Sequence, residues 1–370
     1  MHAQPSAWKS VSVGEDHVCA LDGVGRAYCW GNNHSAQLGA HTPVKCGIIG
    51  ESGARGCYPQ ASQRVLVLAA NGMRFASIGA GEYVTCGIGR EGRAFCWGNP
   101  MGDTAAYRDR CLRDAPCSFS PVPLDPGRRY LALDARSRCF AATDGSARCW
   151  GTRYREGGNA STPWSAPVVA VAGDPETKTF CAAARDGRAY CMGRAEFGIL
   201  GDGAGNGEPG VASTVVGPAV AGPARFTQVA ALGFWVCGLD REGAAHCWGA
   251  ASYSDAPQGG TRAGFERCGD FGSTWCNRTP ARVTAPARFR SVTPMPRGTM
   301  PVTYEMVGLA ADGRAYVWGG DRVVRPWHPE HRWMSVSAAR WGQCGVTVAG
   351  ELFCWGLNPY EEVQGRIAHP

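Results

Sequence analysis

Several patterns that mark membrane-spanning or nucleic-acid-binding proteins are missing from this 370-residue chain. No apolar run is long enough to span a bilayer, and the opening residues, MHAQPSAWKS, lack the apolar segment of a secretory leader. We therefore interpret the chain as a mature form with an added Met1. Lysine is nearly absent, and the arginines are scattered instead of forming the basic stripe with interleaved aromatics that nucleic-acid surfaces need. We expect no nucleic-acid partner and no membrane span.

The signatures of common enzymes are also absent. The chain contains no G-x-S-x-G, no H-E-x-x-H, no phosphate-binding glycine loop and no dinucleotide fingerprint. Its 8 histidines do not pair at ligand spacing within one regular element, and its cysteines lack the C-x2-C pairs of zinc sites. These absences predict a non-enzymatic protein with no catalytic residue, no metal and no cofactor.

Cysteine, in contrast, is abundant and regularly spaced. Of the 18 cysteines, 12 form pairs ten residues apart, and Trp-Gly or Met-Gly follows the second member of each pair. A seventh copy of the pattern carries Val307 and Val317 at the two places, so the cysteines are present or absent together, as bonded partners are. The pairs are Cys19–Cys29, Cys86–Cys96, Cys139–Cys149, Cys181–Cys191, Cys237–Cys247 and Cys344–Cys354. Buried free thiols are the alternative interpretation.

A glycine follows the midpoint of every pair, and this predicts a β-hairpin. An odd midpoint residue followed by glycine is typical of a three-residue loop, a type I turn whose last residue has positive φ. The cysteines then lie opposite each other at a non-hydrogen-bonded position, where side chains approach closely enough for a disulfide. Each bond would contribute about 3 kcal/mol in the chain-entropy picture. The glycines are Gly25, Gly92, Gly145, Gly187, Gly243, Gly313 and Gly350.

The remaining six cysteines form three local couples in irregular stretches that follow Trp-Gly. They are Cys46 and Cys57, Cys111 and Cys117, and Cys268 and Cys276. Nine disulfides with no cysteine left over indicate an oxidising compartment, so we predict that the protein is extracellular, periplasmic or at the cell surface.

Alternating apolar strands precede most hairpins, and a shorter strand precedes most of those. Period-2 patterning with Gly and Pro punctuation favours an all-β protein. Seven units of four strands predict a disulfide-rich, seven-bladed β-propeller of four-stranded blades, formed as a single domain by residues 1–370. The first unit lacks its leading strand. We expect the C-terminal VQGRIAHP, residues 363–370, to supply it and to close the ring in the first blade.

Two segments carry a resemblance to a known family. GNNHSAQLG, at Gly31–Gly39, and FGILGDG, at Phe197–Gly203, resemble the regulator-of-chromosome-condensation repeat. The resemblance implies a seven-bladed propeller, but it indicates function weakly, because the family includes a nucleotide-exchange factor, ubiquitin-ligase domains, a plant UV-B receptor and a secreted bacterial β-lactamase inhibitor. The cysteines and the long insertions depart from the intracellular members. The chain is therefore closest in character to the secreted bacterial members.

Strand parity predicts which face of the propeller binds a partner. The loop that precedes each cysteine-bearing hairpin and the insertion that follows its Trp-Gly must emerge on one face of the propeller. The uniform turns within the hairpins emerge on the other face. Aromatic and arginine side chains on rigid, varied loops are typical of binding hot spots. The candidate contact residues are Asp16, His17, Tyr83, Arg136, Arg138, Lys178, Phe234, Trp235, Tyr304, Arg340 and Trp341. Some of these aromatics could instead plug the ring.

The sequence therefore predicts a secreted or cell-surface binding protein that recognises a macromolecular partner through one loop-rich face. A protein partner, which this chain could inhibit, is the first hypothesis. Binding of a surface glycan or of the cell envelope through exposed Trp and Tyr is the second. An intracellular nucleotide-exchange factor or chromatin adaptor is the third, and the cysteines oppose it.

Overall fold

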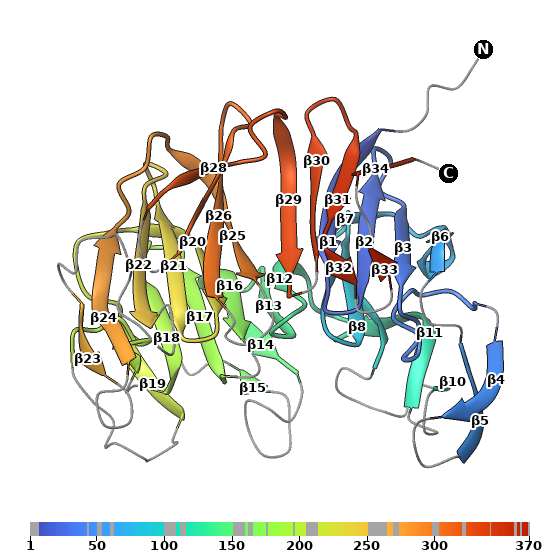
Figure 1. Cartoon of the computed structure of the whole chain (residues 1–370). Helices are drawn as coiled ribbons and strands as arrows, with labels where there is room; N and C mark the ends of the chain where they lie inside the picture. The colour runs from blue at the N-terminus through green and yellow to red at the C-terminus, as the bar shows by residue number, and fades with distance from the viewer. Residues whose placement is uncertain are drawn as a thin grey trace.

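The structure of the protein is a computed structural model in which the chain forms a ring of antiparallel sheets (Figure 1). The residues that the structure describes are 7–42, 44–49, 54–59, 63–99, 109–111, 116–150, 160–161, 166–174, 177–194, 197–204, 214–250, 265–268, 274–297, 303–319, 323–340, 342–358, 361–362 and 365–368.

Seven sheets are the blades, and each is built from one continuous stretch of the chain. Blade one contains β1 (Trp8–Val13), β2 (His17–Asp22), β3 (Ala27–Gly31) and β6 (Gln63–Leu68). Blade two contains β7 (Phe75–Ala80), β8 (Val84–Gly89), β9 (Ala94–Gly98) and β11 (Pro116–Leu124), with β10 (Asp109–Arg110) added at its edge. Blade three contains β12 (Tyr130–Asp134), β13 (Cys139–Ala142), β14 (Ala147–Cys149) and β15 (Ala160–Ser161). Blade four contains β16 (Val168–Asp174), β17 (Thr179–Ala184), β18 (Ala189–Arg194) and β19 (Thr214–Ala219).

The second half of the ring repeats this plan. Blade five contains β20 (Phe226–Leu232), β21 (Trp235–Asp240), β22 (Ala245–Ala250) and β24 (Thr274–Arg282), with β23 (Glu266–Cys268) at its edge. Blade six contains β25 (Phe289–Arg297), β26 (Thr303–Ala310), β27 (Ala315–Trp318) and β28 (Arg325–Trp327). Blade seven contains β29 (Trp333–Ala339), β30 (Gly342–Thr347), β31 (Leu352–Trp355) and β34 (Gly365–Ile367). Outside the blades lie the hairpins β4 (Val44–Ile49)–β5 (Ala54–Pro59) and β32 (Leu357–Asn358)–β33 (Glu361–Glu362), and the short 3-10 turn η1 (Ala70–Gly72).

The hairpins between the second and third strands confirm the predicted turn and the predicted disulfides. In blade one, the Gly25 N–H donates to the Asp22 carbonyl oxygen at 2.9 Å, and Gly25 has a φ of 92°. All six hairpin pairs are disulfide-bonded with Cα atoms 4.1 Å apart, the short spacing of a non-hydrogen-bonded pair. Cys111–Cys117 and Cys268–Cys276 are bonded as well. Cys46 and Cys57 lie opposite each other in the β4–β5 register, and their side chains lie outside the described residues.

The prediction of seven four-stranded blades is confirmed, but the predicted closure of the ring is wrong. The C-terminal strand β34 pairs with β31 of blade seven and not with a strand of blade one. Every fourth strand pairs with the third strand that precedes it in the chain, so each blade is one continuous stretch. The ring closes through packing between blades, because β1 lies against β29 and the buried Trp8, Val11 and Val346 share one apolar cluster.

The same hydrogen bond joins every blade to the next. The first residue of each blade is buried, and its N–H donates to the turn glycine of the preceding blade over 2.6–2.9 Å. The turn lies so close to the next blade that a side chain would clash there, because a Cβ on Gly25 would lie 2.6 Å from the Phe75 carbonyl oxygen. The donor and acceptor residues are Phe75 and Gly25, Tyr130 and Gly92, Val168 and Gly145, Phe226 and Gly187, Phe289 and Gly243, Trp333 and Gly313, and Trp8 and Gly350.

His17 is buried between blades one and two and holds a loop in place. Its Nε2 lies 2.7 Å from the Thr85 hydroxyl oxygen, and that hydroxyl donates to the Gln37 carbonyl oxygen at 2.7 Å. Because the Thr85 proton is used there, His17 Nε2 carries the proton that Thr85 accepts. No described residue bonds Nδ1. Burial lowers the pKa of His17 from its ordinary 6.5 to about 3.

We predict that Val307→Cys/Val317→Cys will form a seventh hairpin disulfide. The two valines are directly opposite in the β26–β27 pair, at the register position of the cysteine pairs. The bond should stabilise the oxidised variant by about 3 kcal/mol over its reduced form, because it closes a short loop in the unfolded chain. Alkylation with intact-mass measurement and denaturant unfolding check this, with each single Cys variant as a control. Two alkylated thiols in the unreduced double variant would contradict the register.

We predict that His17 will make the fold acid-sensitive. Above pH 6.5 the histidine is neutral in both states, so it adds no pH dependence there. Below pH 6.5 the unfolded chain binds a proton that the folded state accepts only near pH 3, so stability falls as pH falls, by about 1.4 kcal/mol per unit. His17→Gln keeps a donor to Thr85 without titrating. At pH 4.5 the wild type should therefore have lost about 3 kcal/mol more than the variant, measured by denaturant unfolding at pH 7.5 and 4.5. Parallel pH profiles would refute this role.

Candidate functional site

Two sets of loops emerge on the same face of the ring. The loops between first and second strands and the insertions between third and fourth strands lie on one face, because successive antiparallel strands reverse direction. We call this the insertion face. Figure 1 shows it at the lower end of the ring, where β4–β5 and β10 project. The opposite face carries the repeated glycine turns of the hairpins.

A hollow opens at the centre of the insertion face, and residues of all seven blades line it. We call it the axial mouth. Its cavity volume is about 80 Å³, which is room for a few water molecules and not for a large substrate. In blade order its lining includes Glu15, Glu82, Arg136, Asp174, Leu232, Gly233, Tyr304 and Arg340.

Arg136 links opposite parts of the axial mouth. Its guanidinium lies 2.8 Å from Glu15 of blade one and 3.7 Å from Asp174 of blade four. Asp174 also accepts hydrogen bonds from the N–H of Gly233 at 3.0 Å and of Thr177 at 3.1 Å. This network ties four blades together and fixes the loops that surround the mouth.

Two further carboxyl groups at this end of the ring have shifted pKa values. Burial raises the pKa of the Asp134 carboxyl, although hydrogen bonds from Ser137 and Gly173 and the charge of Arg136 act in the opposite direction. Burial, and then the neighbouring Glu82 carboxylate, raise the pKa of Asp16. A cation brought to the mouth would relieve the repulsion between Asp16 and Glu82.

The predicted contact residues fall into three groups. Tyr83 and Lys178 are exposed on loops of the insertion face, with 37% of Tyr83 accessible. Asp16, Arg136, Arg138, Tyr304 and Arg340 are half-buried around the axial mouth and the neighbouring loops. His17, Phe234 and Trp235 are buried. Trp341 lies outside the described residues.

The prediction that His17, Phe234 and Trp235 contact a partner is wrong, because their side chains belong to the interior. Trp235 is 0% exposed and lies two residues before Cys237 in the same strand. Because side chains alternate along a strand, Trp235 lies on the same buried face of the sheet as the disulfide. The same spacing separates His17 from Cys19. Phe234 stacks on Phe197 with ring centroids 4.0 Å apart. The two-residue spacing was visible in the sequence and would have identified both strand residues as core.

Three residues at the axial mouth, Glu15, Asp174 and Thr177, were not among the predicted contact residues. A signal for Glu15 exists, since Gly14-Glu15 and Gly81-Glu82 occupy the same place in successive repeats. Asp174 and Thr177 carry no comparable repeat signal.

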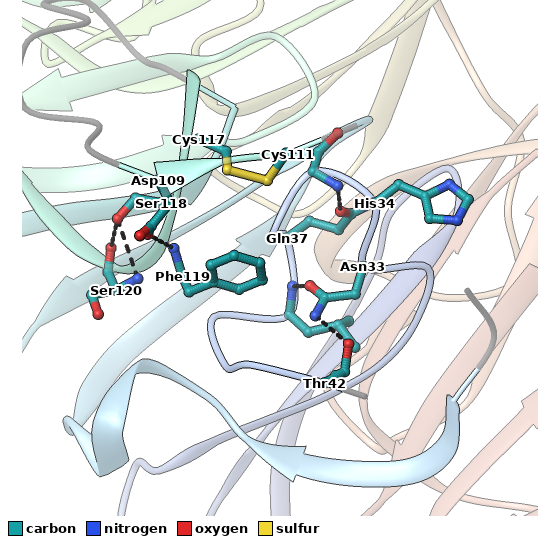
Figure 2. The surroundings of a disulfide bond; sticks show 12 residues. Asn33, His34, Gln37, Thr42, Asp109, Cys111, Cys117, Ser118, Phe119 and Ser120 are labelled. Carbon is teal, nitrogen blue, oxygen red and sulfur yellow. Dashed lines mark hydrogen bonds between the residues drawn. A yellow bond between two sulfur atoms is a disulfide. The ribbon is translucent and has the colours of Figure 1, made fainter. Parts of the chain in front are cut away.

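The disulfide-bearing insertions pack on the loops of the preceding blade. Figure 2 shows Cys111–Cys117 of blade two beside the loop of blade one that contains Asn33 and Gln37. Buried Ala36, Cys117 and Phe119 form one cluster, and His41 stacks on Phe119 at 4.2 Å. Cys268–Cys276 of blade five likewise contacts Phe197 and Ile199 of the blade-four loop. The insertions are thus held on the insertion face by covalent and apolar contacts.

Within the described segments, no group of three or more His, Cys, Asp or Glu side chains is arranged to hold a metal ion. None of the helices found there is long and apolar enough to cross a membrane.

Known proteins share both the repeat and the fold. The profile of the Regulator of chromosome condensation (RCC1) repeat matches residues 8–37, which cover β1 to β3 and the first residues of the loop that follows. Prp20p of Saccharomyces cerevisiae is similar in structure, with a TM-score of 0.63 and 17% identity over 90% of this chain and 80% of that chain. The yeast protein bound to Kap60 matches with a TM-score of 0.64 and 17% identity over 90% and 78% of the two chains.

A plant receptor ectodomain is also similar. The ectodomain of the Physcomitrella patens receptor kinase CR4 matches with a TM-score of 0.53 and 17% identity, over 95% of this chain and 74% of that chain. At these identities the likeness concerns the fold. Residues 8–37 therefore match one such repeat, and the seven four-stranded blades share the propeller fold of these solved structures.

Proposed function

We propose that this protein is a non-catalytic binding protein that works outside the reducing cytoplasm and docks a protein partner on its insertion face. The observation that carries the proposal is the convergence of loops from all seven blades at the axial mouth, on the face that also carries the disulfide-bonded insertions. The opposite face presents nearly identical turns, which offer a partner little that distinguishes one blade from another.

The side chains around the axial mouth suit a protein interface. Tyr83 and Lys178 are exposed, and Arg138 and Arg340 are half-buried beside them in the ring of loops. Tyrosine and arginine dominate the energetics of protein interfaces. The Arg136 network and the disulfides order the loops before binding, which reduces the entropy lost on association.

Eight described disulfides support a compartment in which thiols are oxidised. Related structures support protein recognition as the activity, since Prp20p was characterised for its binding to Gsp1p and histones, and was also solved with Kap60. The cysteines argue against those intracellular partners for this chain.

We predict that a photo-crosslinking residue at Tyr83 will capture the partner, while one at Val24 will not. The two side chains are 37% and 40% exposed, and they lie on the insertion face and on the opposite face. Each benzoylphenylalanine variant is irradiated with culture supernatant and with envelope extract of the host, and adducts are identified by mass spectrometry. A discrete protein adduct at Tyr83 alone is expected.

Adducts of the same species from both positions, or from Val24 alone, would contradict the assignment of the face. An adduct at Tyr83 that soluble sugars displace and proteases leave intact would replace the protein partner with a glycan.

A further inference from the structure

The seven hairpin turns have similar backbones, but side chains complete their hydrogen bonds in different ways. In six of them, a side-chain oxygen accepts a hydrogen bond from the N–H of the residue that follows the turn glycine. Asp144, Asp186 and Asp312 do so from the position before the glycine in blades three, four and six, at 2.9–3.0 Å. The Thr347 hydroxyl oxygen does so in blade seven, at 3.1 Å.

Blades one and five use an aspartate that lies three positions before the turn glycine. Asp22 Oδ1 accepts from the N–H groups of Val24 at 3.0 Å and of Arg26 at 2.8 Å, and its Oδ2 accepts from the Arg26 guanidinium at 2.7 Å. Asp240 repeats the two backbone contacts, at 3.0 Å and 2.8 Å. The blade-one turn therefore presents two N–H groups and one guanidinium to a single carboxylate, and backbone N–H groups arranged in this way are typical anion sites.

The turn of blade two has the same backbone but no such oxygen. Gly89 takes the place of Asp22, since each pairs with the first residue of its blade. The hydrogen bond that closes the turn is also the same, at 2.9 Å in both blades. Among the described residues, nothing accepts a hydrogen bond from the N–H of Glu91 or of Arg93. We call residues 89–93 the open turn.

The open turn keeps the space and the donors that hold Asp22 in blade one. A Cβ on Gly89 would lie 3.6 Å from its nearest neighbour, the Arg93 carbonyl oxygen, so the space where the aspartate side chain begins in blade one is open in blade two. Arg93 occupies the position of Arg26 and is exposed. Its guanidinium has no acidic partner within the part of the chain that the structure describes, whereas that of Arg26 is paired with Asp22.

Three further arginines surround the open turn. Arg90 donates to a carbonyl oxygen of the blade-one turn at 2.9 Å, and Arg129 of blade three donates to the Glu91 carbonyl oxygen. Arg74 is exposed in the loop that leads into blade two. The open turn therefore has four arginine side chains in or beside it, including Arg93, and one carboxylate, that of Glu91.

The surroundings of the open turn favour a polymer with repeated carboxylates. The carboxylates of the adjacent turns, Asp22 and Asp144, are already paired with Arg26 and Arg128. Among the described residues, the exposed large apolar side chains include one aromatic, Tyr83, which lies on the insertion face. Protein interfaces draw most of their binding energy from Trp, Tyr and Arg together, so a surface that offers arginine without exposed aromatics is better suited to a polyanion. Several carboxylates on one chain also bind together more tightly than a single one.

We propose that the open turn is a binding site for a carboxylate, and that this carboxylate belongs to an acidic polysaccharide. It takes the place that Asp22 fills in blade one and accepts from the N–H groups of Glu91 and Arg93 and from the Arg93 guanidinium. Neighbouring carboxylates of the polymer meet the other arginines around the turn. The inference does not depend on the proposed function, because the open turn lies on the face opposite to the insertion face. The protein can therefore hold a surface polysaccharide on one face and a protein partner on the other.

The first test follows the backbone N–H resonances of arginine. The full chain with ¹⁵N-labelled arginine is titrated with oligogalacturonate, and single Arg→Lys variants identify the resonances by their loss. We expect the Arg93 resonance to shift. Those of Arg26, Arg188 and Arg314 should stay still, because their N–H groups already have carboxylate acceptors. Added salt should reverse the shift, since the arginines that hold the polymer are exposed.

The decisive variant is Glu91→Asp, with Glu242→Asp as its matched control. Both glutamates precede a turn glycine and are exposed, and both substitutions keep the charge. In blade two the shorter side chain should accept from the Arg93 N–H, as the aspartates of blades three, four and six do in their turns. The affinity for oligogalacturonate should then fall roughly tenfold or more, since charge-assisted hydrogen bonds are lost. In blade five Asp240 already fills this place, so the control should bind as the wild type does.

A second variant, Gly89→Asp, rebuilds the blade-one turn. It should cause the same loss of affinity and raise the midpoint of denaturant unfolding, which also shows that it folds. The inference is overturned if the Arg93 resonance does not move, if either variant of the open turn binds as the wild type does, or if Glu242→Asp loses as much affinity as Glu91→Asp.

Two comparisons test the choice of a polysaccharide. Polyglutamate that binds more tightly than galacturonate with the same number of carboxylates would overturn it in favour of an acidic protein segment. Acetate that produces the same shift at the same carboxylate concentration would overturn it in favour of a free small carboxylate.

Discussion

The fold depends on one backbone hydrogen bond, which runs from the first N–H of each blade to the turn glycine of the blade before it. All seven seams make it, including the one between Gly350 and Trp8 that closes the ring. The bond requires a turn that comes within contact distance of the next blade, and positive φ without a Cβ meets this need at Gly25. In six of the seven blades, a hairpin disulfide behind the turn fixes the two strands that present it. The cysteine pair and the turn glycine therefore repeat along the sequence because they form the contact between one blade and the next.

This constraint separates the two faces of the ring. The turns that make the seams are nearly uniform, because each must fit the next blade in the same way. The loops on the insertion face do not have to fit the next blade through this hydrogen bond, so their sequences can differ. They form the axial mouth and carry the insertions. At two seams these loops also contact the next blade, where the Trp97 and Trp248 indole N–H groups donate to the Gln37 and Ile199 carbonyl oxygens.

The blades, the hairpin turns and the pairing of the described disulfides could be predicted from the sequence, because spacing along one hairpin is a local property. Ring closure could not. A repeat of four strands can be divided at any strand, and only the tertiary pairing of β34 with β31 decides the division. Burial of Trp235 was predictable from its two-residue spacing to Cys237, whereas Phe234 is buried by a stack on Phe197, distant in sequence. The Arg136 network also joins residues far apart in the chain, so it does not follow from local patterns.

The most direct test of a disulfide-bonded propeller that works outside the reducing cytoplasm is a count of free thiols. Protein isolated from its host is denatured without reduction, alkylated and weighed intact. The account predicts no adduct, because every described cysteine is bonded. Adducts on the hairpin cysteines would mean that the bonds do not exist in the host, and would contradict both the compartment and the rigid insertion face.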